Sequence, residues 1–197
     1  MKPAAALALL ACGLAQAQSW DFDVRLDGKP VGSHRFTVNG PPAAREVHSV
    51  ASMDVKLLGL TLFRYRHEAR ERWRGDCLAE LQSSTDDDGK PLKVAQTRAE
   101  ADDCLMGFAY WNPALPTQTR LLNPQTGQIE QARFERLPDA ALSVRGRETQ
   151  AARWRLIATP PGGPRQELVL WLDRGDAGWL GLDARVKGDR LLTYRLK

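Results

Sequence analysis

Hydrophobic and polar residues alternate through most of this 197-residue chain. Residues 20–26 carry an apolar side chain at each even position and a charged side chain at each odd position. Successive side chains of a β-strand point to opposite faces of a sheet, so this pattern predicts a strand with one buried face and one face in water. Turn residues follow at Asp27-Gly28-Lys29-Pro30, and residues 31–39 are expected to form the return strand of a hairpin.

The longest alternating segment covers residues 61–73. From Arg64 to Arg72 its even-numbered face is charged throughout, and its odd-numbered face carries Phe63, Tyr65, His67, Ala69, Glu71 and Trp73. At about 3.3 Å per residue this strand would be about 40 Å long, which is long enough to twist and curl. A helix is not favoured, because at 3.6 residues per turn the same aromatic side chains would scatter around the axis.

Further strands are predicted between turn residues along the rest of the chain, at residues 47–57, 77–85, 92–98, 127–136, 142–147, 151–158, 166–173, 178–186 and 190–196. Residues 108–127 carry too many prolines and asparagines for a strand, and there Asn112 as N-cap and Pro113 at the first helical position predict a short helix. About ten strands with short links favour a mainly β fold. We expect an antiparallel meander curled into an open or closed barrel, with a helix or loop insertion around residues 108–127.

The first 17 residues have the features of a signal peptide. Lys2 precedes an apolar stretch at residues 4–11, and Ala15-Gln16-Ala17 forms a small-x-small cleavage site. Residues 18–197 are then expected to form a single periplasmic domain, within the usual length of about 100–200 residues. The apolar stretch is shorter than the roughly 20 residues that a membrane-spanning helix requires, so no transmembrane segment is expected. An alternative is a lipoprotein signal with Cys12 as the lipidated residue.

Loss of the leader would leave Cys77 and Cys104, which are expected to form a disulfide in an oxidising compartment. The formal charge would fall from +4 to +3 with the loss of Lys2, and acidic and basic residues are interspersed. No nucleic-acid partner is therefore expected. The sequence also lacks G-x-S-x-G, H-E-x-x-H and Walker motifs, and Asp86-Asp87-Asp88-Gly89 lacks the rest of an EF-hand loop. We expect no metal, no cofactor and no recognisable catalytic residue.

Two histidines fall on the apolar faces of their strands. By parity, His67 shares its face with Tyr65 and Trp73, and His34 lies among aromatic and aliphatic residues. Our hypothesis is that both line an interior pocket with Glu71 and offer hydrogen-bonding or acid–base groups to a ligand. The alternative, that they are hydrogen-bonded core histidines, stays open.

The irregular segment supplies a second group of candidates. Tyr110, Trp111, Asn123 and Gln125 stand where the alternation breaks, and loops on a rigid scaffold commonly carry binding groups. Aromatic faces beside amides suit a sugar, a peptide or a lipid head group. The alternative is that Phe108 and Trp111 plug one end of the barrel and are held there by the disulfide.

Motifs along the whole chain carry a family resemblance. They are Trp20-Asp21-Phe22, Leu26-Asp27-Gly28-Lys29, Gly32-Ser33-His34-Arg35-Phe36, Tyr65 with His67 and Trp73, Gly75-Asp76-Cys77-Leu78, Cys104 with Phe108-Ala109-Tyr110-Trp111, residues 121–127, and Trp171, Trp179, Leu191 and Tyr194. Through them the chain resembles small secreted proteins of Gram-negative bacteria that are catalogued as a domain of unknown function. The resemblance implies no activity. In layout the chain is also similar to open-barrel periplasmic carriers of lipoproteins and other apolar cargo, a likeness of architecture only.

The preferred interpretation is a non-enzymatic periplasmic module that binds or carries an apolar or amphipathic ligand, such as a lipid or an envelope component, in the concave face of the sheet. The candidate ligand-binding residues are His34, Tyr65, His67, Glu71, Trp73, Tyr110, Trp111, Asn123 and Gln125. One alternative is a structural or partner-binding envelope protein whose barrel is filled by its own side chains. A third is an enzyme that acts on envelope glycans or lipids through His67 and Glu71.

Overall fold

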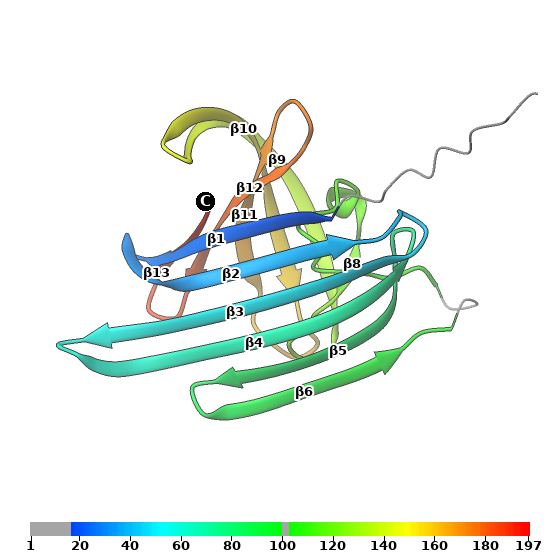
Figure 1. Cartoon of the computed structure of the whole chain (residues 1–197), viewed down its shortest axis with the longest axis horizontal. Helices are drawn as coiled ribbons and strands as arrows, with labels where there is room; N and C mark the ends of the chain where they lie inside the picture. The colour runs from blue at the N-terminus through cyan, green and yellow to red at the C-terminus, as the bar shows by residue number, and fades with distance from the viewer. Residues whose placement is uncertain (1–16, 100–102) are drawn as a thin grey trace, which may run out of the picture.

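A computed structural model describes residues 17–99 and 103–197, and their strands form one twisted sheet (Figure 1). The only helix in this part of the chain is η1, a 3-10 helix at Leu115–Thr117. The strands are β1 (Gln18–Leu26), β2 (Lys29–Asn39), β3 (Arg45–Leu57), β4 (Leu60–Arg74), β5 (Cys77–Asp87), β6 (Lys90–Thr97), β7 (Met106–Gly107), β8 (Arg120–Leu122), β9 (Ile129–Val144), β10 (Arg147–Thr159), β11 (Gln166–Asp173), β12 (Trp179–Val186) and β13 (Arg190–Leu196).

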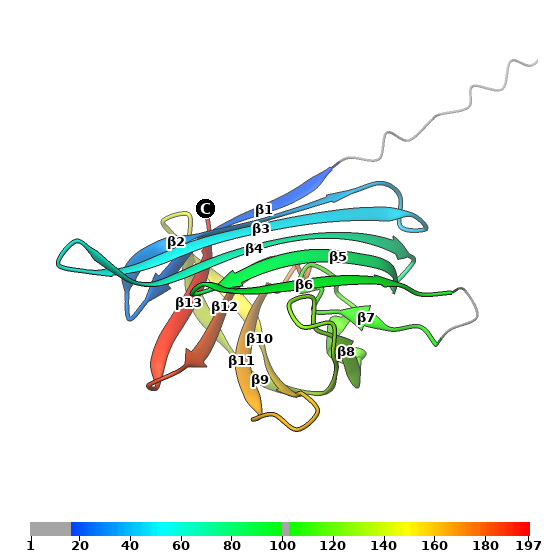
Figure 2. The same cartoon turned by 90° about the horizontal axis from the view of Figure 1, so that it is seen from below.

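Two antiparallel meanders make up this sheet. One contains β1 to β6 and the other β8 to β13, while the short β7 adds to β8 in parallel. The halves are joined because β1 pairs antiparallel with β13, from Phe22 opposite Leu196 to Leu26 opposite Leu192. In Figure 2 the strands β9 to β12 run across the direction of β1 to β6. The strands β6 and β7 remain the two ends of the sheet, so the expected mainly β, barrel-like fold is confirmed in its open form.

The core lies between the two halves, on the strand faces that the alternation predicted. Phe22 and Val24 of β1 are fully buried, and Trp73 of β4 is 2% exposed. The opposite face of β4, from Arg64 to Arg72, is exposed or half-exposed along its length. From the second half, Leu156 and Trp179 pack into the same cluster. Sheet curvature, rather than helix packing, therefore creates the interior.

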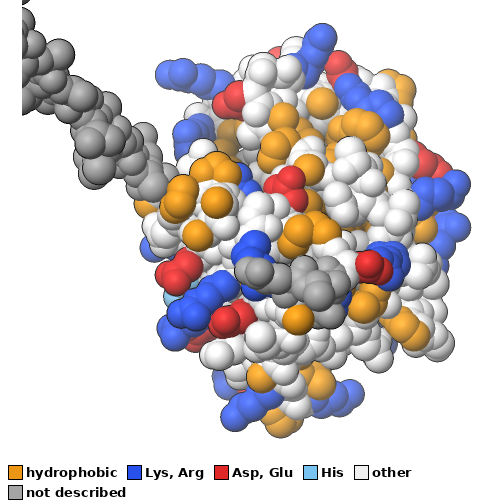
Figure 3. Space-filling view, turned by 90° about the vertical axis from the view of Figure 1, so that its right-hand side faces the viewer, with side chains coloured by type: hydrophobic (Ala, Val, Ile, Leu, Met, Phe, Trp, Pro, Cys, Tyr) orange, Lys and Arg blue, Asp and Glu red, His pale blue; other side chains and the backbone are white. Residues whose placement is uncertain are grey.

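One end of the barrel is closed by the segment between β6 and β9. Leu105, Met106, Leu115 and Leu121 of this segment are buried in the main core. The Trp111 ring stands edge-on to the Trp73 ring, with their centroids 5.4 Å apart. Figure 3 looks at this end, where hydrophobic side chains lie in small groups among charged ones. The expectation that aromatic residues of this segment plug one end holds for Trp111.

The structure corrects two details of the predicted elements. Residues 127–136 and 142–147 do not form separate strands, because β9 runs continuously through Pro138. Leu137 faces Arg153 and Ala140 faces Ala151, so Pro138 lies in a bulge, where its missing N–H interrupts no ladder bond. The short helix expected from Asn112 and Pro113 is the single turn η1, which begins two residues after Pro113.

Asn112 has a different function from the helix cap that its sequence position predicted. Its Oδ1 accepts a hydrogen bond from the Ala114 amide at 2.9 Å, and its Nδ2 donates to Asp76 Oδ1 at 2.8 Å. The side chain thus ties the closing segment to the turn before β5. The strands β7 and β8 on either side of η1 were not predicted, because pieces of two and three residues are too short to show an alternation.

The predicted leader, except Ala17, and the alternative lipidation site Cys12 lie outside the described residues. Among the residues described, no helix has the length and apolar character needed to cross a membrane.

The predicted disulfide between Cys77 and Cys104 is present, with a sequence separation of 27 residues. It joins the first residue of β5 to the segment that closes the barrel. Next to it, the Leu78 amide donates to the Leu105 carbonyl at 2.8 Å, which continues the attachment along the backbone. The disulfide therefore fixes the closed end of the barrel to its wall.

Replacing both cysteines, Cys77→Ala with Cys104→Ala, should lower the free energy of unfolding by about 3.5 kcal/mol, because a loop of this size is no longer closed in the unfolded chain. Urea denaturation followed by tryptophan fluorescence measures the change. The parent protein treated with a reductant is the control and should show the same loss. An unchanged midpoint in both samples would contradict a stabilising role.

Candidate functional site

A cavity of about 230 Å³ lies between the two halves of the barrel. Eight of the nine residues predicted from the sequence to bind a ligand line it, and they come from β2, β4 and the segment before β9: His34, Tyr65, His67, Glu71, Tyr110, Trp111, Asn123 and Gln125. Trp73 is the exception, since it is buried in the core and does not line the cavity. Its Nε1 donates to Glu71 Oε2 at 2.8 Å. Parity thus predicted the inward direction of His34, Tyr65, His67 and Glu71, whereas the other four were selected as residues of the irregular segment.

The second half of the sheet supplies much of the opposite wall. Phe36 of β2 meets the Trp179 ring of β12 at 5.0 Å between centroids, and Tyr110 lies 5.2 Å from the same ring. Tyr194 of β13 and the exposed Gln166 at the start of β11 also line the cavity. Sequence analysis did not select Phe36, Gln166, Trp179 or Tyr194 as ligand-binding candidates. Trp179 and Tyr194 do belong to the motifs of the family resemblance.

His34 is the most unusual polar group of the cavity. Its ring lies 4.1 Å from that of Phe36 and 5.8 Å from that of Tyr194, between centroids. Its Nε2 is shielded from solvent and has no hydrogen-bond partner within the described chain. Burial lowers the pKa of His34 to about 3, and the neighbouring His67 adds to the effect. The imidazole is therefore neutral at physiological pH, and a buried polar atom is left free to bond a ligand.

His67 and Glu71 line the same cavity but have different partners. His67 Nδ1 lies 2.8 Å from Thr85 Oγ1, and burial lowers the pKa of its ring. Burial raises the pKa of Glu71 to about 7, against the opposing effect of the hydrogen bond from Trp73. Four residues separate them along β4, or about 13 Å of strand, and no hydrogen bond joins them in the described part of the protein. His67 is thus partly the hydrogen-bonded core histidine of the alternative interpretation.

Residues 123–127 connect the second half of the barrel to β4 and β6 of the first half. They cross the opening between the two ends of the sheet, here called the seam. The Tyr65 hydroxyl donates to Gln125 Oε1 at 3.3 Å, and Gln96 Nε2 of β6 donates to the Gly127 carbonyl at 2.8 Å. Asn123 holds this loop in shape, because its Oδ1 accepts from the Gln125 amide at 2.8 Å. Gln125 and Tyr65 consequently form a polar rim across the seam.

Glu130 is a buried group that sequence analysis missed. It is 1% exposed, and its Oε1 accepts a hydrogen bond from Asn123 Nδ2 at 2.7 Å. Its Oε2 lacks a partner among the residues described. The signal was available, because even-numbered parity places Glu130 on the same face of its strand as Ala132, which is also buried. Burial of Tyr110 raises the pKa of its hydroxyl, and the neighbouring Glu130 and Tyr65 add to the effect.

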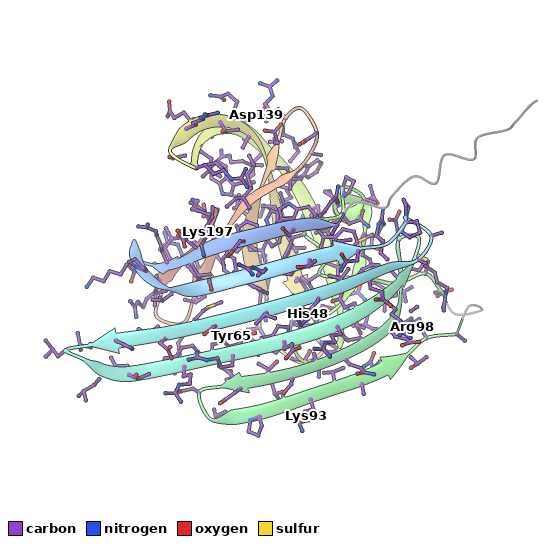
Figure 4. All side chains as sticks on the ribbon, viewed as in Figure 1. His48, Tyr65, Lys93, Arg98, Asp139 and Lys197 are labelled. Atoms are coloured by element: carbon purple, nitrogen blue, oxygen red, sulfur yellow. A yellow bond between two sulfur atoms is a disulfide. The ribbon has the colours of Figure 1, made fainter. Side chains whose placement is uncertain are left out.

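A close histidine–carboxylate pair does occur, but on the outer surface. His48 Nε2 of β3 lies 2.9 Å from Glu68 Oε1 of β4, and both side chains are exposed. Figure 4 labels His48 on β3 and Tyr65, which lines the cavity, on the adjacent β4. No cluster of three or more metal-ligating side chains occurs within residues 17–99 and 103–197.

Comparisons with known proteins agree with the fold. A family model described as a domain of unknown function, DUF6134, matches residues 22–197. The chain is also similar to the crystal structure of a β-barrel-like protein of the domain of unknown function DUF1849 from Brucella abortus, with a TM-score of 0.56 and 11% identity. That alignment covers 93% of this chain and 96% of the other, and at this identity it shows the fold alone. No curated protein matches the chain.

Because the pKa of Glu71 is raised, the free energy of unfolding should fall as the pH rises. The unfolded carboxyl ionises near pH 4.5 and the folded one near pH 7, so the folded state loses stability as the pH rises between these values. Glu71→Gln removes this loss and should stabilise the protein at pH 8 by on the order of 2 kcal/mol, with little gain at pH 4. Urea denaturation at both pH values measures the difference.

Glu68→Gln is the matched control, since Glu68 lies on the outer face of the same strand and its pKa is lowered by its contacts with His48 and Arg70. This variant should show no gain at pH 8. A Glu71→Gln effect of the same size at both pH values would contradict the raised pKa.

Proposed function

Because the chain belongs to the DUF6134 family, whose function is not known, we propose a function from the geometry of its cavity: a non-enzymatic module that binds or carries an apolar or amphipathic small molecule. The observation that carries this proposal is the aromatic cavity that contains the shielded, unpartnered Nε2 of His34. Membership of a family of unknown function and the barrel-like fold agree with the family resemblance found in the sequence.

The size of the cavity limits the ligand. A volume of about 230 Å³ is below the usual range of roughly 300–1,000 Å³ for sites that enclose a small molecule. The site therefore suits one part of an amphipathic molecule, such as a ring, a head group or a length of acyl chain, while the remainder extends past the rim. Aromatic rings from both halves of the sheet supply the apolar contacts, and a few polar groups fix the orientation of the ligand.

The electrostatic state of the lining favours a neutral ligand portion. His34 is neutral, and burial raises the pKa of Tyr65 to about 12, so its hydroxyl stays protonated. Glu71, with a pKa of about 7, changes its charge in the neutral pH range. A hydroxyl, amide or ester group could bond His34 Nε2 without bringing an uncompensated charge into the cavity.

The competing functions receive less support from the same residues. An enzyme that works through His67 and Glu71 would need the two groups to converge on a reacting atom, whereas they bond to Thr85 and Trp73 respectively. A structural protein with a filled barrel is the stronger competitor, because large side chains such as Trp73 and Trp179 do fill much of the interior.

Export to the periplasm is part of the proposal. The leader predicted at residues 1–17 and the disulfide in the folded chain both support it, since disulfides persist in oxidising compartments. The apolar interior and open seam would then serve a molecule that water does not carry freely between envelope layers.

Protein purified from cells without organic solvent should retain a small molecule that native mass spectrometry detects as added mass. Ser49 is 6% exposed and lines the cavity, so Ser49→Phe should fill the cavity and abolish retention. Val50 is the next residue along β3 and faces outward at 42% exposure, so Val50→Phe is the matched control and should retain the molecule. A parent protein without added mass would contradict the carrier function and favour the filled barrel.

A further inference from the structure

The hairpin between β3 and β4 ends in a cluster of exposed leucines, here called the leucine tip, that the cavity does not use. Its members are Leu57, Leu58, Leu60 and Leu62, whose exposed fractions are 57%, 96%, 70% and 57%. In Figure 1 this hairpin projects beyond the neighbouring strands at the left of the molecule. Scattered exposed leucines are normal on a protein, but four within six residues form a patch.

The leucine tip lacks neighbours because its two strands are longer than those beside them. The pairing of β2 with β3 ends at Met53, and the pairing of β4 with β5 begins at Tyr65. Residues 55–63 therefore project as a two-stranded ribbon with both outer edges unpaired. Such a ribbon has little stability of its own in water. The barrel therefore leaves this apolar surface uncovered.

The turn at the tip indicates that a leucine is not needed there for folding. Leu58 has a φ of 49° and Gly59 a φ of 83°, a left-handed pair for which Asn or Asp is preferred at the first position. Two other hairpins of the chain follow this preference with Asp27-Gly28 and Asp88-Gly89, while a third has Arg145-Gly146. A leucine in the left-handed region is unfavourable for the backbone. Its presence at the most exposed position points to a role in binding.

The shape and charge of the leucine tip fit binding to a fluid, anionic surface. Leu57 and Leu60 pair across the ribbon while Leu58 forms its end, so the apolar surface is a knob rather than a flat face. Residues 54–66 carry three cations and one carboxylate, and Arg64 and Arg66 both pair with that carboxylate of Asp54, which leaves Lys56 as the cation at the tip. Lys56, adjacent to the tip, makes no ion pair within the described residues. Leucines that enter the acyl region below cations at the head groups are typical of interfacial membrane binding.

We propose that the leucine tip docks the protein onto a phospholipid bilayer with anionic head groups. The inward-facing row of the two strands runs from Tyr65, at the cavity, through Phe63 and Val55 to Leu57 and Leu60. Docking would therefore place the bilayer about 16 Å along β4 from the cavity wall. The inference does not rest on the proposed function, because the tip lies outside the cavity and is tested on a different surface.

Vesicle flotation tests the docking. The protein is expressed from its full sequence and purified in the form that cells accumulate. Its N-terminal residue is determined by mass spectrometry of the intact protein. It should float with vesicles of phosphatidylethanolamine and phosphatidylglycerol, and less with phosphatidylcholine alone. Leu58→Asn should weaken the partitioning about tenfold or more, because a leucine no longer enters the acyl region. Asn is preferred at this turn, so the thermal midpoint should stay equal or rise.

Leu92→Asn is the matched control, since Leu92 is an exposed leucine on β6, away from the tip. It should float as the parent does, and Leu60→Asn should repeat the loss seen for Leu58→Asn. Equal flotation of the parent and Leu58→Asn would overturn the proposal, as would a parent that does not float. Concentration-dependent dimers that Leu58→Asn abolishes, without vesicle binding, would overturn it in favour of a second copy of the chain as the occupant.

Discussion

The pairing of the first strand with the last is the interaction on which the rest of this structure depends. Each meander alone is a sheet with one apolar face, and within residues 17–99 and 103–197 neither has a helix layer to cover it. When β1 pairs with β13, Phe22 comes into contact with Trp179, at 4.2 Å between ring centroids, and with Tyr194, at 6.1 Å. The two apolar faces then bury each other, and the cavity forms between them.

The two ends of the barrel differ in how well they are covered by other parts of the chain. At one end a disulfide and a buried segment that includes Trp111 fix the closure. At the other, strands of unequal length leave a two-stranded ribbon without neighbours. Stability is expected to concentrate at the closed end, where the packing is dense.

Inside the cavity, desolvation rather than charge pairing sets the chemistry. Burial keeps His34 neutral and favours the protonated form of Glu71. On the outer faces the opposite holds, and ion pairs such as Arg66 with Asp54 lie in water, where each contributes little to stability. The alternation of the strands therefore separates two electrostatic environments, a nearly uncharged interior and a charged exterior.

The sequence by itself determined most of the strands and their inward faces, because alternation acts between adjacent residues and shows in any short window. It also determined the disulfide, because only two cysteines follow the predicted leader. It also placed Tyr65, His67 and Glu71 on one face, and these do line one cavity. Only the tertiary structure decided that β1 meets β13, that β9 continues through the bulge at Pro138, and that Trp73 is buried in the core and does not line the cavity. These outcomes depend on pairings between segments far apart in the chain, which no local pattern encodes.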